Sequence, residues 1–181
     1  VSRIEVALDG AGFTTYTAPL TLAEGRHTIL YRAVDQLGNV ETTQTLTLRS
    51  DASAALTSLA FQGGRQASGP DSSTFYASTA TRFLLPALDP IVSDVASGLA
   101  STNWRQNGGV FQAYSTTIAF AAGVYSLDYQ SQDRVGNLEA LRSTTVRVDG
   151  GGPFTVGVYG SPNAIISGVR YVTPATMLWF N

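Results

Sequence analysis

Two copies of one short motif hold the residues best suited to bind a metal ion. Asp35-Gln-Leu-Gly-Asn39 is followed by Glu41, and Asp133-Arg-Val-Gly-Asn137 is followed by Glu139. Calcium needs several oxygen ligands at about 2.3–2.6 Å, and a loop that precedes the second copy offers further carboxylates. The candidate calcium ligands are Asp133, Asn137, Glu139, Asp89, Asp94, Asp35, Asn39 and Glu41.

The same motif also has a structural interpretation. Its Asp side chain can accept hydrogen bonds from backbone N–H groups two residues on, and Gly and Asn both tolerate positive φ. Together these residues would close a hairpin between the last two strands of a domain. We favour this interpretation because carboxylates are sparse and the spacing is not that of an EF-hand loop, and we keep calcium as the alternative.

The chain contains few of the residues that catalytic sites commonly use. His27 is the only histidine, and no G-x-S-x-G elbow accompanies it. There is no Cys, hence no disulfide, thiolate nucleophile or Cys-based zinc site. All eleven basic residues are Arg, which excludes a Schiff-base lysine, a P-loop lysine and a Lys–Asn isopeptide cross-link. We predict no catalytic residue, no organic cofactor and no enzymatic activity, and we expect His27 to occupy a core or corner position.

The composition of the chain argues against nucleic acid and membranes as partners. Hydrophobic residues make up 44% of the chain, which suffices for a buried core, whereas charged residues make up only 13%. A formal net charge of −2 offers no basic surface for nucleic acid or for an anionic membrane. No run of about 18 apolar residues is present, so we expect no membrane span. The chain opens at Val1 without a signal region, and we expect it to be an excerpt of a longer protein.

An internal repeat organises the chain. Residues 1–51 align with 99–149 without a gap, and 76–85 align with 171–180. The residues identical in the first alignment include Gly10, Phe13, Tyr16, Gly25, Tyr31, Asp35, Gly38, Asn39, Glu41, Arg49 and Asp51. We therefore expect 1–51 to be the C-terminal half of one repeat, 52–149 a complete repeat, and 150–181 the N-terminal strands of a third.

Side chains alternate with the two-residue period of β-strands. In 26–34, the set His27, Ile29, Tyr31 and Ala33 alternates with polar residues such as Thr28 and Arg32, and no useful window shows a helical period. A repeat of about 98 residues has the size of an immunoglobulin-type domain. The predicted fold is all-β, with tandem immunoglobulin-like (fibronectin-III-like) antiparallel β-sandwiches.

Residues 9–16 and 23–41 resemble the Ig-like repeat of large bacterial cell-surface proteins, which runs "DGG-x-W-x-x-Y … G-x-H-T-(I/V)-x-Y-R-A-x-D-x-x-G-N-x-E". The copy at 107–114 and 123–139 is similar but more divergent, and Asp94-Val-Ala-Ser-Gly98 fits the "D-x-x-SG" that commonly precedes the third strand. The resemblance covers nearly the whole chain and implies the fold. Such repeats serve as stalks, adhesins and spacers beside enzymes, so it implies function only loosely.

Two further features have alternative interpretations. The aromatic residues Trp104, Tyr16, Tyr114, Phe13 and Phe111 could form a sugar-stacking platform, but core or hairpin packing is the simpler explanation. The incomplete repeats at the two ends could reflect an excerpt. Alternatively, strands 150–181 of one molecule could complete the half-sandwich 1–51 of the next by strand addition.

The expected function is a structural or adhesive repeat module of a long secreted or surface-anchored bacterial protein, which includes a filament assembled head-to-tail by strand complementation. The alternative is a non-catalytic spacer or carbohydrate-binding accessory module beside an extracellular enzyme. The expected partners are neighbouring repeats, identical subunits head-to-tail, or an extracellular glycan or protein ligand. The expected location is extracellular or at the cell surface.

Overall fold

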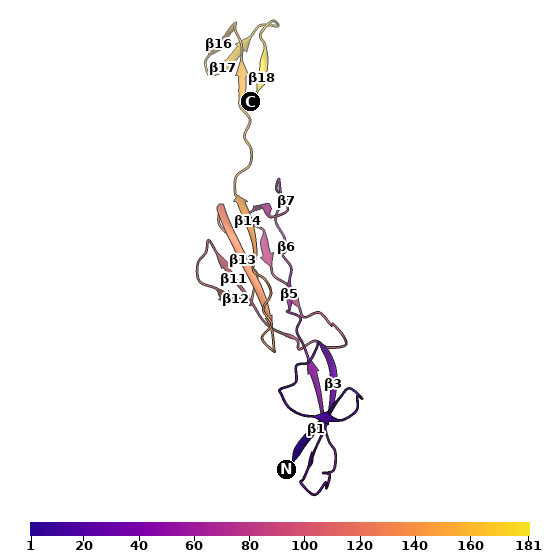
Figure 1. The fold of residues 1–181 in the computed structure, drawn as a ribbon. Coiled ribbons are helices and arrows are strands. Elements are labelled where there is room, and N and C mark those ends of the chain that lie inside the picture. The colour runs from indigo at the N-terminus through magenta and orange to yellow at the C-terminus, as the bar shows by residue number, and fades with distance from the viewer. The chain divides into compact units, whose positions relative to one another are not determined.

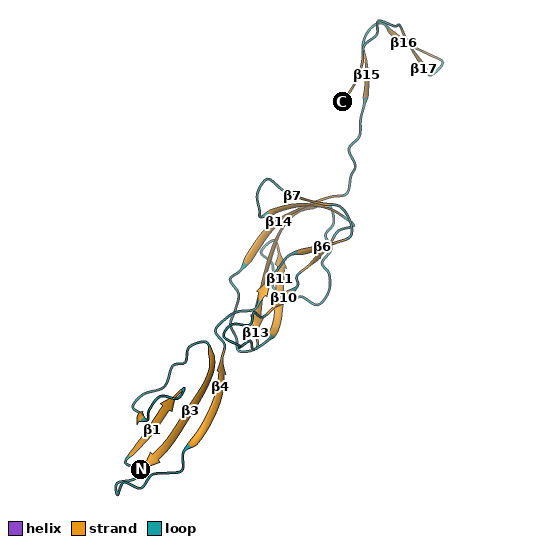
Figure 2. Ribbon diagram, turned by 90° about the vertical axis from the view of Figure 1, so that its right-hand side faces the viewer, coloured by secondary structure: helices purple, strands orange, loops and turns teal.

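The computed structural model describes all residues 1–181, and every regular element in it is a β-strand (Figures 1 and 2). The predicted all-β class is therefore confirmed. Two compact units are present, Val1–Asp149 and Gly150–Asn181, and each is described by itself below. No helix of a length and hydrophobicity able to cross a membrane occurs.

Residues 1–50 form one four-stranded antiparallel sheet, which we call the first sheet. Its strands are β1 (Arg3–Leu8), β2 (Thr14–Thr15), β3 (Gly25–Val34) and β4 (Gln44–Ser50). Their order is β2-β1-β3-β4, so β3 is flanked on both sides and β4 is an edge strand. This edge leaves backbone groups without strand partners.

Residues 52–149, which we call the central segment, contain a larger sheet and two short strand pairs. The strands are β5 (Leu56–Thr57), β6 (Ala60–Gln62), β7 (Gln66–Ser68), β8 (Thr74–Ser78), β9 (Arg82–Leu84), β10 (Ala87–Leu88), β11 (Leu99–Gln106), β12 (Gln112–Ala113), β13 (Gly123–Asp133) and β14 (Arg142–Asp149). The larger sheet has the order β12-β11-β13-β14-β8-β7, in which only β14 and β8 run parallel. The short pairs are β10-β5 and β6-β9.

The core of the central segment lies between the larger sheet and the β6-β9 pair. Phe83 and Leu85 pack with Leu127 and Val146, and all four are at most 1% exposed. The backbone of Phe83 exchanges two hydrogen bonds of 2.9 Å with Ile118. Since apolar residues of both layers meet in one cluster, the arrangement is consistent with a β-sandwich.

A chain of aromatic contacts runs through this core. Phe61 contacts Phe75 and Phe83, with ring centroids 5.1 and 5.4 Å apart, and Phe83 contacts Phe120 at 5.2 Å. Phe120 then stacks on Tyr125 at 4.6 Å. Tilted and edge-to-face ring pairs contribute about 0.5–1.5 kcal/mol each beyond area burial, so these rings help to fix the layers against each other.

The first sheet has the same strand pairing as β11–β14. Val6 pairs with Tyr31, as Trp104 pairs with Tyr129. The isolated bridge between Val34 and Val40 corresponds to that between Gln132 and Leu138. Aligned positions of 1–51 and 99–149 therefore occupy equivalent places in two sheets.

The two sheets differ in what covers them. Tyr31 is 40% exposed and Leu20 41%, whereas their counterparts Tyr129 and Ile118 are 7% and 4% exposed. Burial in the central segment comes from strands between residues 56 and 88, which have no counterpart over the first sheet. Tyr31, a member of the alternating set predicted from the sequence, is partly exposed because no such layer covers it.

The unit Gly150–Asn181 consists of two short strand pairs, which we call the tail hairpins. Their strands are β15 (Gly157–Tyr159), β16 (Asn163–Ile166), β17 (Val169–Val172) and β18 (Leu178–Phe180). β15 pairs with β18 and β16 with β17, both antiparallel. Most of their large apolar side chains are exposed, including Ile165 at 61% and Phe180 at 75%.

Candidate functional site

The two Asp-x-x-Gly-Asn loops close the hairpins between the third and fourth strand of each sheet. Asp133 Oδ1 accepts hydrogen bonds from the backbone N–H groups of Gly136 and Asn137, both at 2.8 Å, and Oδ2 accepts one from Asn137 Nδ2 at 2.7 Å. Asp35 accepts the corresponding bonds from Asn39 at 2.8 and 2.7 Å. The intervening glycine has positive φ in both loops, so this geometry is that of the structural interpretation.

Both aspartates are held in the ionised form. Side-chain and backbone hydrogen bonds from Asn39 lower the pKa of Asp35. Burial raises the pKa of Asp133, but hydrogen bonds from Asn137 and Gly136 outweigh that effect and the net pKa is lowered. Asp133 is thus a carboxylate that is only 2% exposed.

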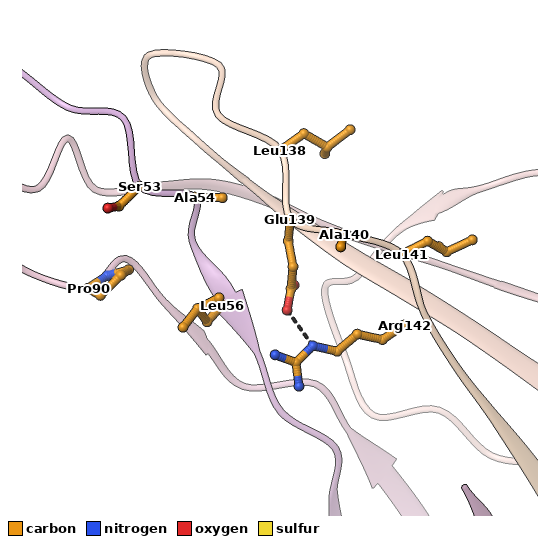
Figure 3. A pocket seen from close by; sticks show the side chains of 9 residues that line it. All are labelled: Ser53, Ala54, Leu56, Pro90, Leu138, Glu139, Ala140, Leu141 and Arg142. Carbon is orange, nitrogen blue, oxygen red and sulfur yellow. Dashed lines mark hydrogen bonds and ion pairs between the residues drawn. The ribbon is translucent and has the colours of Figure 1, made fainter. Parts of the chain in front are cut away.

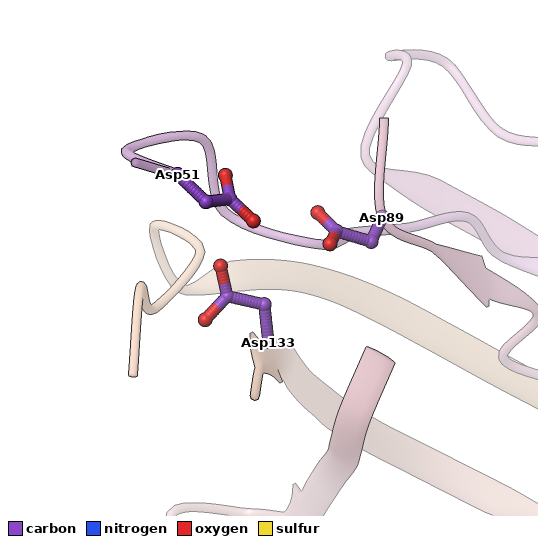
Figure 4. Close-up of side chains that lie close together, drawn as sticks. All are labelled: Asp51, Asp89 and Asp133. Atoms are coloured by element: carbon purple, nitrogen blue, oxygen red, sulfur yellow. The ribbon is translucent and has the colours of Figure 1, made fainter. Parts of the chain in front are cut away.

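Three carboxylates from distant parts of the chain meet beside this loop. Asp51, Asp89 and Asp133 each contribute an oxygen, and the three oxygens lie within 4.8 Å of one another (Figure 4). Asp51 Oδ2 accepts the backbone N–H of Ser97 and Asp89 Oδ2 that of Gly98, both at 2.6 Å. Asp89 Oδ1 is buried and has no hydrogen-bond partner.

This cluster has the donor set of a hard divalent cation. Calcium binds carboxylate oxygens at about 2.3–2.6 Å, and one ion within the cluster would offset the repulsion among three like charges. A buried carboxylate oxygen without a partner costs free energy that an ion would recover. Asp51, Asp89 and Asp133 are therefore the residues that could hold calcium, and the metal stays a prediction.

The other sequence-predicted ligands lie elsewhere or have other partners. Asn137 borders the cluster, where its Nδ2 donates to Asp133 and, at 3.0 Å, to the backbone oxygen of Asp51. Asp94 is exposed, with φ 61°, in the tight turn that precedes Val95. The motif residues Asp35, Asn39 and Glu41 belong to the first sheet, where no further carboxylate joins them.

Glu139 is buried and is not one of the three carboxylates of the cluster. Its carboxylate accepts the backbone N–H of Thr57 at 3.1 and 3.2 Å and that of Ser131 at 3.2 Å. It also pairs with Arg142 Nε at 2.5 Å, at the floor of an open, largely apolar groove (Figure 3). With these partners Glu139 ties β5 to β13.

Asp51 is the site residue that the sequence interpretation missed. It directly follows the last residue of β4, and its only signal in the sequence was its position at a predicted repeat boundary. Three groups donate hydrogen bonds to Asp51. The backbone N–H of Ser97 donates to its carboxylate, Asn137 Nδ2 donates to its backbone oxygen, and the backbone N–H of Ser53 donates to Oδ1 at 3.2 Å. We call this set of contacts the Asp51 joint, because it fixes the end of the first sheet to loops of the central segment.

His27 lies in a corner of the first sheet between two acceptors. Its Nδ1 is 2.8 Å from Asp9 Oδ2 and its Nε2 is 2.9 Å from the backbone oxygen of Ala23. The hydrogen bond with Asp9 and then that with Ala23 raise the pKa of His27. With both ring nitrogens engaged and the residue 9% exposed, the geometry is that of a structural ion pair.

The aromatic residues do not form one exposed platform. Trp104 and Tyr114 pack against the core of the central segment. The ring of Phe13 is covered by the guanidinium of Arg32 at 3.9 Å, and Phe111 is covered by that of Arg105 at 4.6 Å. Each of these cation–π contacts occupies one of the two ring faces on which a sugar could stack. Tyr16 is 40% exposed.

No protein-family model matches this chain, and a search of the curated proteins finds no significant relative.

Proposed function

We propose that this chain is a structural repeat segment of a long secreted or surface-anchored bacterial protein, in which immunoglobulin-like modules of about 98 residues follow one another. The recurring strand pairing of β1–β4 and β11–β14 supports the repeat. The resemblance to Ig-like repeats of bacterial surface proteins supports the extracellular location. The role needs stable sheets and defined joints between them, and no chemical step.

The Asp51 joint is the observation that carries this proposal. A flexible linker would leave the residue between two modules solvated, whereas Asp51 has both its backbone oxygen and its carboxylate bound by the following module. Several hydrogen bonds to one residue restrict its backbone dihedral angles, so the joint fixes the orientation of one module relative to the next. A rigid rod requires a fixed orientation between successive modules, whereas a flexible linker leaves that orientation free.

The rigidity of the joint can be measured directly, because the chain contains no cysteine and spin labels would therefore attach only at introduced cysteines. Spin labels at Thr15→Cys and Gln112→Cys, both exposed strand positions, report the distance between the two sheets. We expect a narrow distance distribution that Asn137→Ala broadens, because this change removes the bond to the Asp51 backbone oxygen.

Asn39→Ala is the matched control for this experiment. Asn39 makes the same bonds within its own hairpin but none to a following module. We expect Asn39→Ala to leave the distance distribution narrow. A broad distribution in the unsubstituted protein, or equal broadening by the two variants, would show that the joint does not fix the modules.

A further inference from the structure

The Asp51 joint lies beside the only two buried side-chain polar atoms of residues 1–181 that have no hydrogen-bond partner. These atoms are Glu24 Oε1 and Asp89 Oδ1. Asp89 belongs to the cluster with Asp51, and Glu24 adjoins it through Ser53, which donates its hydroxyl to Glu24 Oε2 at 3.0 Å and its backbone N–H to Asp51 Oδ1 at 3.2 Å. Because a buried acceptor without a partner costs free energy, both atoms indicate that a positively charged group is missing from the joint.

The negative charge of the cluster is not neutralised by ion pairs. None of the five ion pairs in the structure includes Asp51, Asp89 or Asp133. Arg134 lies close by, since a Cβ built at Gly98 would be 3.6 Å from its Cζ atom, and it brings one positive charge against three negative ones. Carboxylates this close repel one another, so a cation among them would be favoured.

The geometry of the cluster suits a single ion of the size of calcium. The three carboxylates point toward one another, and one oxygen of each lies within 4.8 Å of the other two (Figure 4). Two oxygens bound to one calcium ion at about 2.3–2.6 Å can be up to about 5 Å apart. Magnesium needs shorter bonds in near-ideal octahedral order, whereas backbone N–H groups of separate loops already hold these carboxylates in place.

The three carboxylates come from both sides of the joint. Asp51 directly follows β4 of the first sheet, whereas Asp89 follows β10 and Asp133 ends β13 in the central segment. An ion bound by all three would therefore connect the first sheet to the central segment. Without an ion, repulsion from Asp89 and Asp133 acts on Asp51 and opposes the hydrogen bonds that Ser97 and Asn137 donate to it.

We propose that one calcium ion bridges Asp51, Asp89 and Asp133, and that its binding stiffens the joint between the two modules. This proposal rests on the structural function proposed above, because it assigns a regulator to the same joint. With the ion bound, the three carboxylates attract a common centre and Asp51 is held in place. When the ion is removed, Asp51 is repelled by the other two, and the range of orientations between the modules widens. The stiffness of the segment therefore follows the calcium concentration around it.

Binding is measured by isothermal titration calorimetry with Ca²⁺ alone, on the 1–181 protein freed of metal with a chelator. We expect one ion per chain. Asp51→Asn and Asp89→Asn should each weaken binding at least about tenfold, because the amide keeps an oxygen that accepts a backbone N–H but removes one of three negative charges. Asp94→Asn is the control, since Asp94 is exposed and its φ of 61° suits Asn, and it should leave the affinity unchanged.

Stiffness is measured with the spin labels at Thr15→Cys and Gln112→Cys, once in Ca²⁺ and once in EDTA. We expect a narrow distance distribution in Ca²⁺ and a broader one in EDTA. With Asp51→Asn the two solutions should give the same width, because no ion bridges the joint, whereas Asp94→Asn should behave like the unsubstituted protein. A merely structural role of Asp51 would make the width independent of calcium in every variant. Urea unfolding in EDTA, with an unchanged midpoint, shows that the variants are folded.

These results are separable from those on the proposed structural function. A narrow distribution in both solutions would retain the rigid joint and overturn its control by calcium. An absence of binding, or binding that neither Asp51→Asn nor Asp89→Asn weakens, would overturn the calcium bridge whatever the width of the distribution. A broad distribution in both solutions would overturn the rigid joint itself, while the titration still reports separately whether the ion binds.

Discussion

Glu41 and Glu139 occupy equivalent places in the two sheets, and the structure predicts that removing Glu139 costs much more stability than removing Glu41. Both accept the backbone N–H of the residue eight positions before them, Ala33 or Ser131. Only Glu139 also accepts the N–H of Thr57 from the covering layer, with its side chain 3% exposed. Substitution by Ala at both positions therefore compares one motif with and without that layer.

The expected cost of Glu139→Ala follows from the groups it leaves without a partner. Thr57 and Ser131 are 2% and 0% exposed, and a buried N–H without an acceptor costs about 1–3 kcal/mol. Arg142 has a side chain 46% exposed, so its ion pair contributes at most about 1 kcal/mol. We expect about 3 kcal/mol in total, and less than about 1 kcal/mol for the exposed Glu41, whose donor water can satisfy.

Trp104 provides a readout confined to the central segment. A Trp179→Phe background makes it the only tryptophan of the chain, and it packs against the central core. In urea, with a slope of about 1–3 kcal/mol/M, a loss of 3 kcal/mol lowers the unfolding midpoint by at least about 1 M. Glu41→Ala should leave the midpoint of Trp104 fluorescence unchanged.

Equal shifts for the two substitutions would refute this reasoning, because the covering layer would then make no energetic difference to the motif. So would a shift for Glu139→Ala below about 1 kcal/mol. Glu139→Gln distinguishes charge from hydrogen bonding. Its amide oxygen can still accept one N–H, so we expect an intermediate midpoint.

Three further outcomes are expected. Calcium at a hundred times its dissociation constant should stabilise the protein by about 2.7 kcal/mol relative to a sample with chelator. Asp89→Asn should abolish this difference, whereas Asp94→Asn, at an exposed residue, should leave it unchanged. If calcium does not change the melting midpoint of the unsubstituted protein, the metal site is refuted. The pKa of His27 is raised from 6.5 and that of Asp9 is lowered from 3.8, so the stability from their pair is fully present between pH 3.8 and pH 6.5. This stability is lost as pH rises through the raised pKa of His27, and at the acid end as pH falls through the lowered pKa of Asp9. An NMR titration should show that Asp9→Asn lowers the pKa of His27, and an unmoved pKa would contradict the pair. Phe83→Ala should cost about 3–5 kcal/mol in urea unfolding, because it empties a fully buried site between the two layers, and a cost below about 1 kcal/mol would place Phe83 outside the core.

Part of the candidate site could be predicted because it depends on local spacing. An Asp two to four residues before Gly-Asn meets the N–H groups of its own turn wherever the turn lies, and Asp35 and Asp133 both do so. The cation cluster could be predicted only in part. Asp89 and Asp133 were candidates, but Asp51 joins them from a third segment, and no local rule relates residues that far apart in sequence.

The sequence by itself determined the all-β class, the alternation along the strands and the chemistry of the hairpin loops, since these depend on periods of two and on contacts within a few residues. Only the tertiary structure decided which equivalent residues are buried. Tyr129 and Glu139 lie under a second layer, whereas Tyr31 and Glu41 occupy the aligned positions of the first sheet and remain exposed. Burial is a property of what packs above a strand, and that layer comes from residues distant in sequence.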